Sequence, residues 1–196
     1  MQATTKKQVI ETIALFGGII AIFFEWLAVL LFYINFPTEF GGEKPISYFA
    51  TLPQTRIIFV SCLSLAAISF WIFVRWHLKK RIETPVKVFA LSMLFYFGTA
   101  VFPFELDNGM SENIHKLFAY LFGLTFILGI YLIGKNSIYK KLKFFSHAIT
   151  VIVLLLNLLM FFAVDKTHIL FFEVLAGFLC QIWTVGITYF TYKIKQ

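Results

Sequence analysis

Long apolar stretches constrain the fold of this chain more than any other feature. Six of them recur along its 196 residues, at 10–34, 57–76, 86–102, 114–134, 145–164 and 168–192. An apolar run of about 18 residues or more is long enough, as a helix, to cross about 30 Å of hydrocarbon. Helices are the default there because they satisfy their own backbone hydrogen bonds. We therefore predict an all-α, polytopic integral membrane protein, in which residues 1–196 form one bundle of six transmembrane helices.

The basic residues predict how these helices are oriented. Of the 17 Lys and Arg residues, all but four lie in the two tails or beside the second and fourth connections: Lys6, Lys7, Arg75, Lys79, Lys80, Arg81, Lys87, Lys135, Lys140, Lys141, Lys143, Lys193 and Lys195. Lys and Arg are enriched in cytoplasmic loops. This pattern predicts that both termini are cytoplasmic. It fixes the orientation alone, and the bacterial inner membrane is the expected location. The net charge of +7 is then a topology signal, and we predict no nucleic-acid partner.

A polar stretch interrupts the apolar pattern between the third and fourth runs. It reads FPFELDNGMSENIHKLFAY, residues 102–120. The predicted orientation places it on the extracytoplasmic face, where Ser111 is expected to cap the fourth helix. Together with charged residues of the other outer segments it forms what we call the acidic lip: Glu39, Glu43, Glu105, Asp107, Glu112, His115, Asp165 and His168.

Two carboxylates lie inside the apolar runs. Glu25 is about 15 Å below the outer end of the first helix, and Glu173 is closer to the outer end of the sixth. A carboxylate at such depth faces the bundle interior or a partner. A polar cavity open to the outside and an interhelical hydrogen bond that fixes packing are both consistent with this position. Asn157 and Gln181 are expected to form interhelical hydrogen bonds.

Signatures of metal binding and nucleophilic catalysis are weak. The chain has no HExxH or GxSxG motif, and we predict no cofactor. His115, His168 and Asp165 are weak metal candidates, and a solvated acidic loop explains them equally. His77 and His147 lie beside basic segments and are expected to be interfacial anchors. The basic clusters at 76–81 and 139–143 are expected to contact anionic lipid headgroups, as in most proteins of this kind.

Two outer segments carry a family resemblance. They read KPISYFATLPQTRIIFVSCLSLAAISF, residues 44–70, and VFPFELDNGMSENIHKLFAYLFG, residues 101–123. These segments resemble a family of small bacterial six-helix membrane proteins of uncharacterised role, and also the Frag1/DRAM/Sfk1 group. The resemblance implies six helices with cytoplasmic termini, a link to lipid remodelling, and site positions at Ser47, Arg56, Asp107 and His115. The chain is also similar to ceramidase-like hydrolases, but it lacks their seventh helix and a late HxxxH.

These observations lead to three alternative functions. The first is binding or sensing of a lipid or small amphiphile at an extracytoplasmic polar mouth, formed by Ser47, Arg56, Glu105, Asp107, His115, Glu173 and Glu25. The second is a membrane-embedded lipid hydrolase or acyltransferase, with His115 as general base, Asp107 orienting it and Ser47 as a further candidate. The third is a proton- or cation-coupled transporter that uses Glu25 and Glu173. Membrane lipids are the expected partners, and a homo-oligomer or an assembly with another membrane protein is compatible with the sequence.

Overall fold

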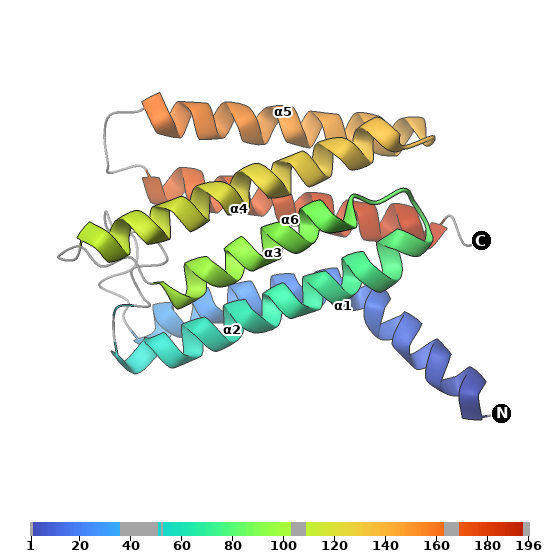
Figure 1. Cartoon of the computed structure of the whole chain (residues 1–196), viewed down its shortest axis with the longest axis horizontal. Coiled ribbons are helices and arrows are strands. Elements are labelled where there is room, and N and C mark those ends of the chain that lie inside the picture. Colours follow the sequence, from blue (N-terminus) through green and yellow to red (C-terminus); the bar gives the residue numbers. More distant parts are fainter. Residues whose placement is uncertain (1, 36–50, 52, 103–108, 163–168, 194–196) are drawn as a thin grey trace.

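The chain folds into a bundle of helices (Figure 1). The computed structural model describes residues 2–35, 51, 53–102, 109–162 and 169–193. In chain order the helices are α1 (Gln2–Asn35), α2 (Pro53–Ile72), the π-helical turn η2 (Phe73–His77), the 3₁₀ turn η3 (Leu78–Lys80), α3 (Val86–Val101), α4 (Gly109–Asn136), α5 (Lys140–Phe162) and α6 (Ile169–Lys193). No strand occurs within the described residues, so the all-α prediction is confirmed for them.

The lengths of these helices suit a membrane. Five apolar stretches are long enough to cross one: Glu11–Leu31, Thr55–Lys80, Gly109–Asn136, Lys140–Leu159 and Val174–Lys193. The helix α3 is also apolar but has only 16 residues, which corresponds to about 24 Å. A bilayer thins locally around a short helix at modest cost. The described helices are therefore compatible with an integral multi-pass membrane protein, and the sixth crossing stays a prediction.

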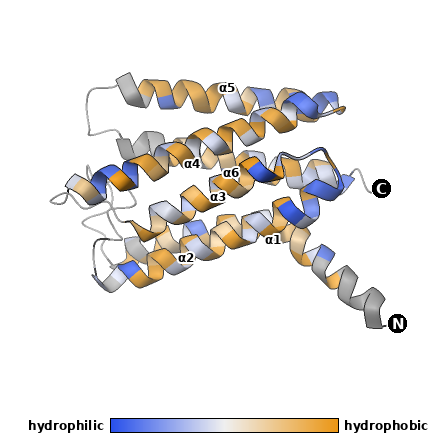
Figure 2. Cartoon of the chain, viewed as in Figure 1, coloured by the Kyte–Doolittle hydropathy of each residue, from blue (hydrophilic) through white to orange (hydrophobic). Residues whose placement is uncertain are grey.

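The helices close into a ring. Each one packs against its neighbours in sequence, and α6 returns to pack against α1. Both termini lie at the same end of the bundle, together with the connections α2–α3 and α4–α5 (Figure 1). Most of the hydrophilic ribbon gathers there as well (Figure 2). We call this the basic end, after its residues Arg75, Lys79, Lys80, Arg81, Lys135, Lys140, Lys141, Lys143 and Lys193.

Aromatic rings form the centre of the bundle. Trp183 on α6 is 0% exposed, and its ring lies 6.0 Å from that of Phe89 on α3 and 6.2 Å from that of Phe126 on α4. Phe70 on α2 lies 5.7 Å from Phe89 and 5.3 Å from Phe126. The Trp183 indole donates a hydrogen bond of 3.0 Å to Ser146 Oγ on α5. One cluster therefore joins five of the six long helices.

The helix α1 joins the bundle through two glycines. A Cβ atom on Gly17 would lie 2.6 Å from the Ser69 carbonyl oxygen of α2, and one on Gly18 would lie 2.7 Å from the Thr184 methyl group of α6. Real Cβ atoms do not approach that closely, so these glycines allow α1 to lie against both neighbours. Small residues serve the same purpose at helix interfaces throughout membrane proteins.

Gly17→Ala is expected to destabilise the protein by about 1–3 kcal/mol, because the new methyl group meets rigid backbone and not a flexible side chain. The matched control is Gly177→Ala, since a Cβ at Gly177 meets nothing within 4 Å. Thermal unfolding of both variants in one detergent measures the difference. Equal midpoints for the two variants would contradict the close approach of α1 to α2.

Candidate functional site

A polar cluster lies within the apolar bundle, which we call the polar centre: Glu25, Trp26, Tyr96 and Gln181. Tyr96 Oη on α3 donates to Glu25 Oε1 at 2.9 Å, and Gln181 Nε2 on α6 donates to Glu25 Oε2 at 2.7 Å. Each carboxylate oxygen therefore has one neutral donor, and the two donors come from different helices. Partners of this kind offset part of the cost of a carboxylate in hydrocarbon.

The polar centre extends from Glu25 to the outer surface of the bundle. The Trp26 indole donates to Gln181 Oε1 at 2.8 Å, which orients the Gln181 amide so that its nitrogen faces Glu25. Trp26 is 44% exposed, so one end of this hydrogen-bonded chain reaches the surface where α1 meets α6. Successive hydrogen bonds of this kind polarise one another.

The carboxylate of Glu25 has acceptor capacity beyond these contacts. An ionised carboxylate offers about four acceptor positions, and Tyr96 and Gln181 occupy two of them. These two side chains therefore leave about two acceptor positions of the Glu25 carboxylate unused.

A stripe of small residues turns Glu25 toward the bundle. Ala14, Gly17, Ala21 and Ala28 are all buried on α1, and their spacing of three, four and seven residues places them on one face. Glu25 lies four residues after Ala21 and three before Ala28, so it shares this face. That periodicity is a sequence signal for its direction. Residue spacing gives no indication of which side chains form hydrogen bonds with Glu25.

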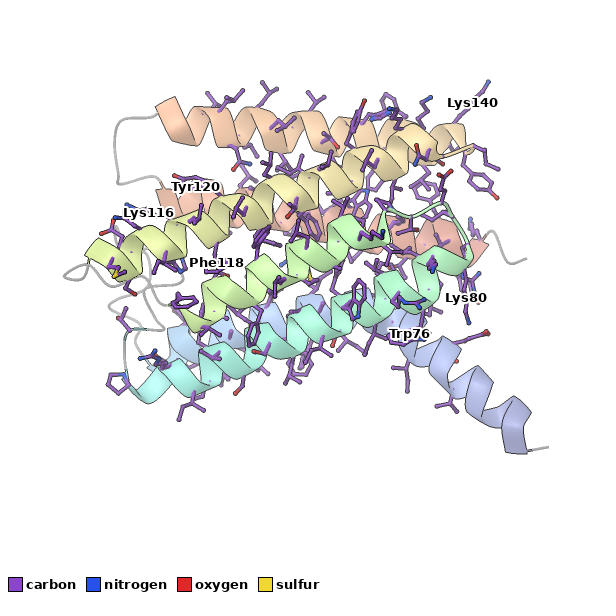
Figure 3. The ribbon with its side chains drawn as sticks, in the orientation of Figure 1. Trp76, Lys80, Lys116, Phe118, Tyr120 and Lys140 are labelled. Carbon is purple, nitrogen blue, oxygen red and sulfur yellow. The ribbon has the colours of Figure 1, made fainter. Side chains whose placement is uncertain are left out.

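At the opposite end from the basic end, His115 ties α4 to the end of α3. His115 is buried and its Nδ1 lies 2.7 Å from the Phe102 carbonyl oxygen. A carbonyl only accepts, so Nδ1 carries the proton and donates. The Phe102 ring also stacks on Phe118 at 5.5 Å, and Figure 3 shows Phe118 near this end of α4. This geometry gives His115 a positioning role between two helices.

The prediction that Ser111 caps the N-terminus of α4 is wrong. The helix begins at Gly109, two residues before Ser111, so Ser111 lies within the first turn. Glu112 of the acidic lip forms an ion pair with Lys116 one turn further along the same helix. Part of the acidic lip is therefore neutralised locally.

The structure describes only some of the other predicted site residues. Arg56 is exposed on the first turn of α2. Glu173 lies on α6, but its side chain is outside the description. The remaining predicted positions fall outside the described residues altogether: Ser47, Glu105, Asp107, Asp165 and His168. Within the part of the chain that is described, no three His, Cys, Asp or Glu side chains group to hold a metal ion. The weak metal candidates at the acidic lip stay untested.

Three expectations about isolated polar residues have clear outcomes. Gln181 does form an interhelical bond, as predicted. Asn157 forms none with the described residues, and its Nδ2 donates to the Val153 carbonyl of its own helix at 2.7 Å. His77 is not an interfacial anchor, since it is buried and lies 2.9 Å from Thr191 Oγ1 on α6.

Comparison with protein-family models, with curated proteins and with solved structures finds no match for this chain. The length and apolar composition of the described helices are compatible with a multi-pass membrane protein. The resemblance to the Frag1/DRAM/Sfk1 group stays a prediction.

Gln181→Leu is expected to destabilise the protein by about 0.6–1.7 kcal/mol, because it removes the hydrogen bonds that join α6 to Glu25 and Trp26. Asn157→Leu is the matched control, since Asn157 bonds only within its helix in the described contacts. Unfolding of both variants in the same lipid or detergent measures the difference. An Asn157→Leu variant as destabilised as Gln181→Leu would contradict an interhelical role for the polar centre.

Proposed function

We propose that this protein binds a lipid or small amphiphile, and that the polar centre recognises a hydrogen-bond donor of its headgroup. The observation that carries the proposal is the Glu25 carboxylate, which neutral side chains from α3 and α6 hold in place while acceptor positions are left over. Neighbouring side chains that hold a binding residue in one orientation prepare it for its ligand.

The route to this site supports a ligand that comes from the membrane. Trp26 is half-exposed beside Glu25, so an amphiphile at the junction of α1 and α6 keeps its chain in lipid while its headgroup reaches inward. Aromatic side chains with one polar atom suit this position. The resemblance to a group linked to lipid remodelling favours the same class of ligand.

In this proposal the acidic lip is the outer mouth of the site. Glu25 lies ten residues before the end of α1 at Asn35, which is about 15 Å. Arg56 and His115 belong to the same end of the bundle, and Ser47, Glu105, Asp107 and Glu173 complete the predicted mouth. The basic end is then cytoplasmic, and the bacterial inner membrane is the proposed location.

The hydrolase and transporter alternatives have less support. The hydrolase requires Asp107 beside His115, and Asp107 lies outside the described residues. The transporter requires Glu173 together with Glu25, and the Glu173 side chain is outside the description. The binding function is preferred because donors from two other helices hold the Glu25 carboxylate and leave acceptor positions on it.

Glu25→Ala is expected to reduce the amount of bound lipid or amphiphile at least about tenfold, since a lost charge-assisted hydrogen bond has this size of effect. Native mass spectrometry of gently solubilised protein, with lipid identification, measures the bound fraction. The matched control is Asn157→Ala, which also removes a polar side chain from the apolar region.

Two outcomes contradict this function. The first is a folded Glu25→Ala variant that keeps every lipid or amphiphile that the wild type binds, which would make the polar centre purely structural. The second is a wild-type protein that retains no lipid or amphiphile under conditions where it stays folded. His115→Asn tests the hydrolase alternative in the same experiment, because the Asn amide can donate to the Phe102 carbonyl but cannot act as a general base. Retained binding in this variant is expected, because His115 contributes to the mouth by positioning it through the hydrogen bond to the Phe102 carbonyl.

The proposed orientation predicts a cytoplasmic C-terminus. A fluorescent protein fused after Gln196 is expected to fluoresce, and alkaline phosphatase fused at the same position is expected to be inactive, because only the first folds in the cytoplasm of a bacterial host. The positive-inside rule gives the physical reason. Active phosphatase with a dark fluorescent fusion would reverse the orientation and place the polar mouth inside.

A further inference from the structure

A second polar feature, a cavity, lies at the basic end of the bundle. It has a volume of about 240 Å³ and is lined by Glu11, Trp76, His77, Lys80 and Arg81. Glu11 belongs to α1, Trp76 and His77 to η2, and Lys80 to η3. Figure 3 shows Trp76 and Lys80 close together at this end, with Lys140 on a different side. The proposed function uses none of these residues.

The end of the second apolar run builds this cavity by leaving α-helical geometry. A π-helical turn at Phe73–His77 is followed directly by a 3₁₀ turn at Leu78–Lys80. Single π-helical turns are rare and frequently occur at functional sites. The 3₁₀ turn carries the chain from His77 to Lys80 and Arg81, and all three residues line the cavity.

His77 forms a fixed inner wall. Its ring stacks on Phe73 at 5.4 Å, and its Nε2 lies 2.9 Å from Thr191 Oγ1. The Thr191 hydroxyl donates to the Ile187 carbonyl at 2.7 Å, so its oxygen accepts from His77 and Nε2 carries a proton. Thr191 is 0% exposed, and the wall is therefore anchored to α6.

The charges around the cavity favour an anion. Arg81 uses one guanidinium nitrogen to donate to the Thr191 carbonyl at 3.2 Å, and a guanidinium has five N–H donors. Lys80 pairs with Glu11 at 3.2 Å, but the Lys80 side chain is 50% exposed, and such surface pairs exchange partners at little cost. Two cations face one carboxylate, so the lining has an excess of positive charge.

We propose that this cavity binds the phosphate-bearing headgroup of an anionic phospholipid. Its volume is below the roughly 300–1,000 Å³ of sites that enclose a drug-sized ligand, so it fits a headgroup and leaves the acyl chains on the outer surface. Trp76 is 41% exposed at its rim, where an indole suits the boundary between headgroups and hydrocarbon. Arg81 provides planar, paired donors that match a phosphate group.

The test compares lipids and variants of the full chain by native mass spectrometry. Phosphatidylglycerol, phosphatidylcholine with the same acyl chains, and inorganic phosphate are titrated separately. Wild type is expected to retain phosphatidylglycerol, and Arg81→Gln is expected to bind it about tenfold more weakly. Lys80→Gln is a second variant, which loses only an exposed contact and so keeps the fold. Lys140→Gln is the control, because it removes the same charge from the basic end outside the cavity.

Specific outcomes overturn the proposal. If Lys140→Gln weakens binding as much as Arg81→Gln and Lys80→Gln do, general surface charge attracts the lipid. If phosphatidylcholine binds as tightly as phosphatidylglycerol, the net charge of the headgroup is not recognised. If inorganic phosphate displaces phosphatidylglycerol at equal concentration, the ligand is a free anion. Binding that persists in Glu25→Ala but is lost in Lys80→Gln separates this site from the polar centre.

Discussion

Close packing around Trp183 is the interaction on which the rest of this bundle depends. Inside a membrane, apolar side chains gain little by leaving lipid, so helices associate through tight contacts and interhelical hydrogen bonds. Trp183 supplies both, since its ring contacts Phe89 and Phe126 while its indole donates to Ser146. Gln181 lies two residues earlier on α6 and therefore projects to another side of the helix. The same packing that buries Trp183 thus presents Gln181 to Glu25 on α1.

The two polar sites use opposite electrostatics at different depths. Glu25 carries a carboxylate into the apolar region and is held by neutral donors from two other helices. The cavity at the basic end gathers Lys80 and Arg81 around His77, at one end of the bundle. Both depend on α6, through Gln181 in one case and Thr191 in the other. A shift of α6 along its axis would therefore disturb both sites together.

The sequence predicted that Glu25 faces the interior or a partner and that Gln181 bonds between helices, but not which side chains they contact. The small-residue stripe on α1 turns Glu25 inward, and the interhelical bond of Gln181 was expected. Asn157 sits in an equally apolar helix, yet a carbonyl of its own previous turn satisfies it. His77 was expected at the interface because basic residues follow it, but a π-helical turn directs it inward. Neither outcome has a signal in residue spacing, because each depends on the neighbouring helix and on local backbone geometry.

The sequence by itself determined that the described chain is helical and apolar enough to cross a membrane, because hydrocarbon leaves backbone groups no partner outside the helix. It also determined that most basic residues lie in the two tails and beside the second and fourth connections, which needs no tertiary information. Only the tertiary structure decided which polar groups meet. Glu25 finds Tyr96 71 residues away and Gln181 156 residues away. Contacts over such separations depend on how each helix is rotated and offset against its neighbours, and that is the result of packing over the whole bundle.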